Sequence, residues 1–157
     1  MKEYYDLEEV SEIIMGQSPS SETYNNSGLG LPFFQGKSEF GEIFPTPVIW
    51  CSTPKKIAEP GDILISVRAP VGPTNLVKET CCIGRGLAAI RPNEEKIIRD
   101  FLWLQLQYLE DELIKKGQGS TFEAINTSDL KKLTVFVPSI EIQNQIASEI
   151  LKHLAEI

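Results

Sequence analysis

The chain has 157 residues, 41% of them hydrophobic, so it is long enough for one ordinary domain with its own core. Three cysteines, two of them adjacent, provide neither a disulfide framework nor a CxxC pair. Because no signal-peptide core or membrane-length apolar run is present either, we expect a reduced, cytoplasmic protein. The formal net charge of −7 argues against a generic binder of polyanions.

The N-terminal half alternates apolar runs with turn-forming residues. Residues 7–15 fit either a short helix or a strand that ends at Gly16. Residues 16–47 are rich in Gly, Pro, Ser and Asn and predict a long loop, anchored by the aromatic residues of LPFFQG; a loop of this length is usually functional or disordered. Short apolar runs close to Gly or Pro predict strands at Val48–Cys51, Ile63–Val67, Thr74–Val77 and Gly86–Ile90.

The second half is dominated by helical patterns. Two adjacent apolar stripes over Glu94–Lys116 predict one long core helix that ends at GQGS, and Leu133–Val137 predicts a last strand. Ser139 is the expected N-cap of a C-terminal helix. Its mostly apolar seam alternates steps of three and four residues, at Ile140, Gln143, Ala147, Ile150, Leu154 and Ile157. This helix either packs on its own domain or belongs to a longer coiled coil, and the sequence favours neither alternative.

Charge is distributed unevenly along the chain. Five carboxylates fall within the first twelve residues. Residues 61–92 carry four basic side chains against two acidic ones, and so do residues 115–132, so that both segments are net positive. A partner meets a local surface rather than the total charge, and two local basic neighbourhoods are therefore compatible with an acidic chain.

No segment has the pattern of a catalytic or metal site. His153 is the only histidine and is far in sequence from every cysteine, and no phosphate-binding glycine loop or nucleophile elbow is present. Cys81 and Cys82 are expected to be small buried apolar residues at the start of a strand. We therefore expect a non-catalytic binding module without a metal.

Four segments in this order and spacing resemble a target-recognition domain of the specificity subunit of Type I restriction–modification systems. They are IIMGQSPS, GDILISVRAPVGPTNL, CCIGRGLAAIRP and GSTFEAINTSDLKKLTVFVPSIEIQNQIASEIL. The resemblance implies an α+β fold: a small mixed domain with a twisted β-sheet, one long core helix, long loops and a C-terminal coiled-coil-type helix. It divides the chain into a DNA target-recognition domain at 1–138 and the start of a spacer or dimerisation helix at 139–157.

The resemblance also implies that loops of the domain enter the DNA major groove and read one half of a split target. Arginine suits this role because its guanidinium donates two hydrogen bonds to guanine O6 and N7. Arg68 lies just beyond a predicted strand, and Arg85 lies between two glycines; each either reads a base or pairs with one of the many carboxylates. The full set of candidate DNA-binding residues is Gln17, Ser18, Ser20, Lys37, Arg68, Arg85, Gln118, Ser120 and Thr121.

As the family pattern implies, the chain is expected to direct adenine methylation and cleavage by partner subunits. Those subunits, not this chain, are expected to hold S-adenosylmethionine, Mg²⁺ and ATP. The expected partners are double-stranded DNA, the methyltransferase subunits, and either the rest of a longer chain or a second copy. A homodimer is expected to pair through Ala147, Ile150, Leu154 and Ile157 and to read a split palindrome; the end of the seam slightly favours a fragment or a shortened natural chain.

Two other classes of function stay open at the level of sequence. An interaction protein that pairs with a specificity subunit and alters or blocks its targeting needs the C-terminal helix but not Arg68 or Arg85. An enzyme that uses Cys81 or Cys82 needs a reactive thiol.

Overall fold

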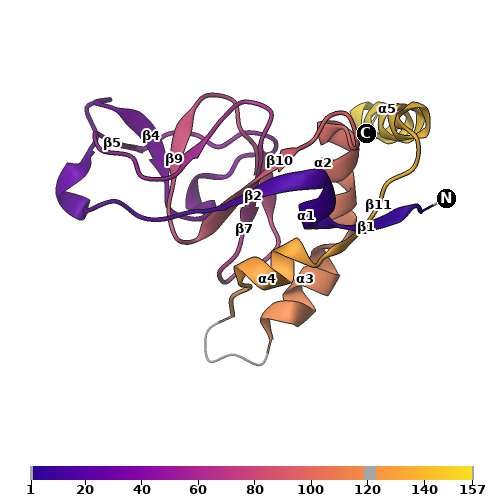
Figure 1. The fold of residues 1–157 in the computed structure, drawn as a ribbon. Helices are drawn as coiled ribbons and strands as arrows, with labels where there is room; N and C mark the ends of the chain where they lie inside the picture. Colours follow the sequence, from indigo (N-terminus) through magenta and orange to yellow (C-terminus); the bar gives the residue numbers. More distant parts are fainter. Residues whose placement is uncertain (1, 119–122, 157) are drawn as a thin grey trace.

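The chain folds into an elongated α+β structure in which the two larger sheets occupy one end and the centre, and the helices gather at the other end together with a short two-stranded sheet (Figure 1). The computed structural model describes residues 2–118 and 123–156. The strands are β1 (Tyr4–Asp6), β2 (Ser11–Met15), β3 (Tyr24–Asn25), β4 (Leu31–Phe34), β5 (Ile49–Cys51), β6 (Ile57–Ala58), β7 (Ile63–Ser66), β8 (Thr74–Leu76), β9 (Cys81–Ile83), β10 (Leu87–Pro92) and β11 (Thr134–Phe136). The helices are α1 (Leu7–Val10), α2 (Arg99–Tyr108), α3 (Glu110–Gly117), α4 (Thr127–Lys131) and α5 (Ile140–Ala155), with short 3₁₀ turns η1 (Ser21–Thr23) and η2 (Lys37–Glu39).

A four-stranded antiparallel sheet in the order β2-β10-β7-β8 forms the centre of the molecule. Every residue of β7 is buried, because the two faces of the strand meet different layers. Ile63 and Ile65 belong to the core that the helices cover, whereas Leu64 belongs to a second core shared with Phe34 of the neighbouring sheet. Burial on both faces explains why this segment reads as a continuous apolar run and why it was correctly predicted as a strand.

A second, five-stranded sheet in the order β3-β5-β4-β9-β6 forms the far end of the molecule. It contains β3 and β4, so the prediction that residues 16–47 form a loop without regular structure is wrong for these two strands. Phe33 and Phe34 are buried, and β4 pairs with β5 on one side and with β9 on the other. Pro32 within β4 obscured the strand signal, because proline inside an apolar run argues against a central strand.

The prediction of one long helix over Glu94–Lys116 is corrected in two places. Its first residues form a separate turn, in which the N–H groups of Lys96 and Ile97 both donate to the carbonyl of Asn93. The helix proper begins only at Arg99, after the extended residue Ile98, and Leu109 separates α2 from α3. In contrast, the predicted strands Thr74–Val77 and Leu133–Val137 appear in slightly shorter form as β8 and β11.

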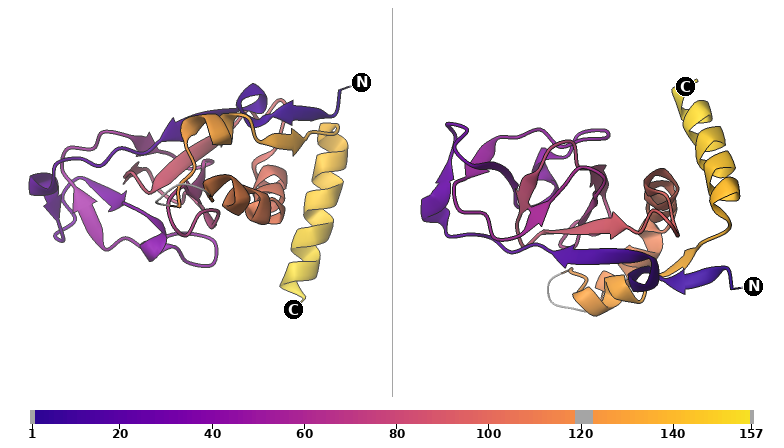
Figure 2. Two further views of the ribbon diagram at one scale, coloured as in Figure 1. Left: turned by 90° about the horizontal axis from the view of Figure 1, so that it is seen from below. Right: turned by 45° about the horizontal axis from the view of Figure 1, so that its top comes forward.

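The C-terminal helix α5 lies across the end opposite the five-stranded sheet, and its last turns extend beyond the body of the protein (Figure 2). Ser139 caps it as predicted, since its side chain accepts a hydrogen bond from the N–H of Ile142. Gln143 joins α5 to the start of α2, because its fully buried amide accepts from the N–H of Ile98 and donates to the carbonyls of Lys96 and Pro138. Within the described ranges, no helix is long and apolar enough to cross a membrane.

Candidate functional site

Three segments that are distant in sequence meet where the two large sheets join. The end of β2 contacts the β9–β10 turn, since the N–H of Gly16 donates to the carbonyl of Leu87 over 2.9 Å. The same turn contacts the chain that follows β4, where the N–H of Gly86 donates to the carbonyl of Gln35 over 2.8 Å. These hydrogen bonds hold residues 16–18, 35–37 and 84–87 together, and we call this place the junction.

Glycines make the close approach at the junction sterically allowed. A Cβ atom at Gly16 would overlap the carbonyl oxygen of Gly84, and one at Gly86 would lie 2.5 Å from the carbonyl oxygen of Gln35. Both contacts are with backbone atoms, which cannot move aside as a flexible side chain can. The second glycine that flanks Arg85 is equally confined, since a Cβ atom at Gly84 would lie 2.9 Å from the Cα of Gln35. Both flanking glycines therefore serve the packing of the backbone, and as a result they fix the place of Arg85.

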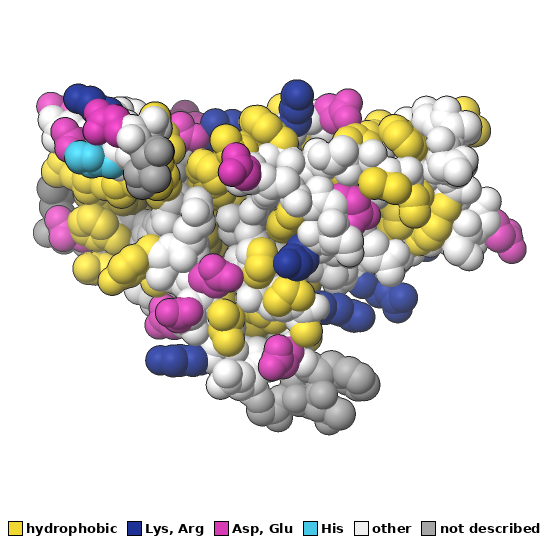
Figure 3. Space-filling view, turned by 180° about the vertical axis from the view of Figure 1, so that it is seen from behind, with side chains coloured by type: hydrophobic (Ala, Val, Ile, Leu, Met, Phe, Trp, Pro, Cys, Tyr) yellow, Lys and Arg dark blue, Asp and Glu magenta, His cyan; other side chains and the backbone are white. Residues whose placement is uncertain are grey.

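Arg68 reaches the same place from the end of β7. The backbone on both sides of it is fixed: the N–H of Val67 donates to the carbonyl of Gly86, and the N–H of Ala69 donates to that of Glu123. Arg68 and Arg85, 17 positions apart in the chain, are both exposed and line the same two surface hollows, of about 1080 Å³ and about 420 Å³. Figure 3 shows Lys and Arg side chains close together on the lower edge of the face that it draws.

Neither guanidinium group is used to hold the fold. Among the described residues, the side chains of Arg68 and Arg85 have no hydrogen-bond or ion-pair partner. Arg91 is different: its Nε and Nη2 donate to the two carboxylate oxygens of Asp62 over 2.8 and 2.9 Å, and this contact raises the pKa of Arg91. Asp62 is 1% exposed, so this is a structural ion pair. Of the two alternatives left open for Arg68 and Arg85, pairing with a carboxylate applies to neither among the described residues, so both guanidinium groups are available to a partner.

The other predicted DNA-binding residues occupy different positions around the junction. Ser18 supports it, since its Oγ accepts a hydrogen bond from the N–H of Arg85 over 3.2 Å. Gln17 and Lys37 are exposed and directly follow Gly16 and Gly36, which line the hollows. Ser20 is exposed at the start of η1, and Gln118 is exposed after α3. Ser120 and Thr121 lie outside the described residues.

Sequence reasoning missed polar residues that line the hollows beside the arginines. The smaller hollow includes three neighbours from the chain after β4, namely Gln35, Ser38 and Glu39. The larger includes Glu123 and Asn126, and the Asn126 side chain also caps α4. The only available signal for the first group was the glycine within QGKSE, which marks a turn but does not indicate where the turn lies in the fold.

The cysteines are arranged as small buried residues, as the sequence predicts. Cys51, Cys81 and Cys82 are all buried, and none of them forms a disulfide. Burial raises the pKa of the Cys81 thiol to about 12 and also raises that of Cys82. A neutral, inaccessible thiol is a poor nucleophile, so the geometry gives no support to an enzyme that uses these residues. The described part of the chain contains no group of three or more His, Cys, Asp or Glu side chains that could hold a metal ion.

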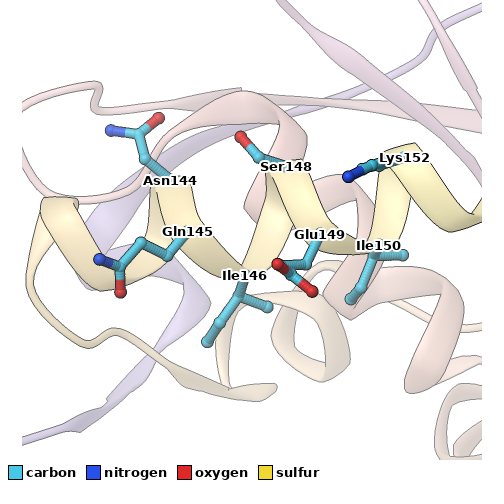
Figure 4. Close-up of a pocket in the computed structure, with 7 residues that line it drawn as sticks. All are labelled: Asn144, Gln145, Ile146, Ser148, Glu149, Ile150 and Lys152. Atoms are coloured by element: carbon cyan, nitrogen blue, oxygen red, sulfur yellow. The ribbon is translucent and has the colours of Figure 1, made fainter.

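The apolar seam of α5 is divided into two parts. Gln143 and Ala147 are buried against the protein's own core, whereas Ile150 and Leu154 are 40% and 54% exposed; Ile157 lies outside the described residues. Figure 3 shows hydrophobic side chains along the part of this helix that carries the single histidine, and in Figure 4 Ile146 and Ile150 point to the same side of it. The first half of α5 therefore packs on its own domain, and the second half presents an uncovered apolar stripe.

Comparison with known proteins gives matches over nearly the whole chain. Residues 2–157 match the family model of the Type I restriction modification DNA specificity domain. The chain is 46% identical over 143 residues to the MjaX type I restriction enzyme specificity subunit of Methanocaldococcus jannaschii, covering 91% of this chain and 34% of that protein. It is 26% identical over 155 residues to the MjaIX specificity subunit of the same organism.

Solved structures agree with this result. The HsdS subunit from Thermoanaerobacter tengcongensis superimposes with a TM-score of 0.89 at 50% identity, over 98% of this chain and 37% of that one. A structure from a study of assembly and conformational transition of the type I R-M system gives 0.90 at 51% identity, over 98% and 38%. The chain thus spans slightly more than a third of the relatives that it matches. It belongs to the family of Type I restriction–modification DNA specificity domains.

Proposed function

We propose that this chain recognises one half of a bipartite DNA target, with the junction as the surface that faces the major groove. The observation that carries the proposal is the pair formed by Arg68 and Arg85. They come from two separate strand ends, their backbones are fixed by hydrogen bonds, and their guanidinium groups are left without a partner among the described residues. A fixed, unpaired guanidinium suits bidentate donation to guanine, for which about 1–3 kcal/mol of discrimination per contact is typical.

The charges around the hollows favour base reading over general attraction to phosphate. Arg68 and Arg85 share the hollows with two carboxylates, Glu39 and Glu123. Sequence-independent affinity for DNA comes mainly from Lys and Arg side chains that neutralise phosphates. With local charges nearly balanced, we expect the chain alone to bind duplex DNA weakly at physiological salt, and nanomolar binding by the isolated chain contradicts this expectation.

The proposal assigns catalysis to other subunits. Adenine methylation and DNA cleavage, together with S-adenosylmethionine, Mg²⁺ and ATP, belong in it to methyltransferase and motor–nuclease partners. The exposed stripe of α5 at Ile150 and Leu154 joins the helical spacer to which the methyltransferase docks. We further propose that two copies pair through this stripe. Such a dimer requires a palindromic target, because a twofold dimer presents the same surface to both half-sites.

Methylation mapping tests the proposal directly. The full-length protein is expressed with its methyltransferase subunit, and N6-methyladenine is mapped across the host DNA. We expect one interrupted motif that appears only when both proteins are present. Arg68→Ala and Arg85→Ala are expected to relax a guanine position or to abolish methylation. Arg99→Ala removes the same charge from a residue that is paired with Asp100 and lines a different hollow, and it is expected to leave the motif unchanged.

Two results contradict the proposal. An unchanged motif in both the Arg68 and Arg85 variants places recognition elsewhere. The absence of any motif, with a stable complex still formed, removes the recognition role itself. A palindromic motif supports the homodimer, and two different half-sites contradict it.

A further inference from the structure

The smaller hollow at the junction contains an acidic side chain whose hydrogen-bonding capacity is not met. Glu39 is the last residue of η2 and lines this hollow together with Arg68 and Arg85. Its Oε2 is buried and has no hydrogen-bond partner. Among the residues that the structure describes, it is the only buried side-chain nitrogen or oxygen without one.

The rest of the protein shows how a buried carboxylate is normally satisfied here. Asp62 accepts two hydrogen bonds from Arg91 and a third from the N–H of Glu59. Glu39 has none of these contacts, and within the described residues it forms no ion pair with either arginine of the hollow. Burial raises the pKa of its carboxyl group, which reflects the same lack of stabilising partners. Leaving a buried acceptor unpaired is unfavourable, so its presence calls for a reason.

The position of Glu39 is fixed by its own backbone. The N–H of Phe40 donates to the carbonyl of Lys37 over 2.9 Å, which closes the 3₁₀ turn. The N–H of Thr46 donates to the carbonyl of Glu39, also over 2.9 Å. These hydrogen bonds fix the backbone of Glu39 in a closed loop beside the hollow that Arg68 and Arg85 also line.

We propose that Glu39 is a specificity-determining residue that accepts a hydrogen bond from the exocyclic amino group of a DNA base, with cytosine N4 as the preferred donor. In the major groove, Glu accepts from cytosine N4 while Arg donates to guanine O6 and N7, so an acid that lines the same hollow as two arginines reads a different base from theirs. The Oε2 atom is buried in the free protein, so the partly buried Glu39 side chain must turn towards the hollow, where the DNA supplies the missing donor. A base that presents a carbonyl at this position places a hydrogen-bond acceptor opposite the Glu39 carboxylate, which is also an acceptor, and is therefore rejected. This inference rests on the proposed function.

Substitution of Glu39 in the full-length protein, assembled with its methyltransferase subunits, tests the inference. Glu39→Gln keeps the shape of the side chain but replaces one acceptor by a donor. We expect the methylated motif to relax or to change at one position, from cytosine towards adenine, with a loss of discrimination of about 5- to 150-fold at that position. Glu42→Gln is the matched control: Glu42 lies in the same loop, is exposed and does not line either hollow at the junction. It is expected to keep the motif.

A binding experiment covers the case in which Glu39→Gln methylates no site at all. Duplexes that carry the wild-type motif are prepared with one base at a time replaced by an analogue without its exocyclic amino group. The wild-type complex is expected to lose affinity at one additional position that the Glu39→Ala complex does not detect. Cytosine and adenine analogues distinguish the two sources of the amino group.

The outcomes separate this inference from the function on which it rests. Equal losses at every position for the wild-type and Glu39→Ala complexes overturn it, as does a Glu39→Gln motif identical to that of the wild type. If Arg68→Ala and Arg85→Ala change the motif while the Glu39 variants do not, only the role of Glu39 fails. If none of the three residues affects the motif, the junction is not the recognition surface.

Discussion

Gln143 offers the sharpest test of how the C-terminal helix is attached to the recognition domain. Its side chain is 0% exposed and forms three hydrogen bonds of 2.8 to 2.9 Å with the backbone of Ile98, Lys96 and Pro138. Gln143→Leu keeps a similar volume but leaves these three backbone groups without their side-chain partner. A net contribution of about 1 kcal/mol per hydrogen bond gives a loss of about 3 kcal/mol, reduced to about 2 by the additional apolar surface that leucine buries.

Urea unfolding followed by circular dichroism measures this loss as a change in the free energy of unfolding. For a chain of this size, a loss of about 2 kcal/mol corresponds to a melting temperature lower by about 4–8 °C. Gln145→Leu is the control, because Gln145 is exposed on the same helix; it is expected to change the free energy by less than about 0.5 kcal/mol. If the two variants are equally stable, the buried amide does not join α5 to the domain.

Three further predictions concern the junction, the ion pair and the cysteines. Gly16→Ala is expected to destabilise the fold and to abolish specific methylation, whereas Gly36→Ala, where a Cβ meets nothing within 4 Å, is expected to preserve the fold; thermal unfolding compares the two variants, and methylation mapping follows the loss in Gly16→Ala. Asp62→Ala is expected to lower the free energy of unfolding by about 2–3 kcal/mol, because it removes the two hydrogen bonds that Arg91 donates and leaves the N–H of Glu59 unpaired, and a value below about 1 kcal/mol in urea unfolding contradicts that. Because the pKa of Cys81 is raised to about 12, its thiol stays protonated at pH 8, and mass spectrometry is expected to find it alkylated by iodoacetamide only after unfolding.

The sequence predicted the strands that carry the arginines but not the register that brings them together. Ile63–Val67 and Gly86–Ile90 are apolar runs next to turns, and both appear as strands in the central sheet. Arg68 and Arg85 become neighbours because Ser66 pairs with Leu87, so that the end of β7 meets the start of β10. Strand register depends on which faces are buried, and a single sequence gives no direct information on it for strands buried on both sides.

Two features of the candidate site were beyond sequence reasoning for different reasons. Glu39 lies in a segment whose glycines and prolines indicate turns, and the position of a turn relative to the sheets is set by contacts that are distant in sequence. The helix α4 was missed because it has only five residues, too few for an apolar period, although Asn126 and Asp129 form a capping box at its start. The seam of α5 was visible, but the pattern alone could not separate its buried first half from its exposed second half.

The acidic total charge of the chain is compatible with DNA recognition because the N-terminal carboxylates lie at the other end of β2 from the junction. Glu12 is near the start of this strand, where Arg91 partly neutralises it over 3.6 Å, and Gly16 follows its end. A strand rises about 3.3 Å per residue, so four residues separate the two positions by about 13 Å. Exposed charges further apart than the Debye length, about 8 Å at physiological salt, interact only weakly. A base approaching Arg68 and Arg85 therefore meets the charges of the hollows, and the N-terminal acids contribute little there.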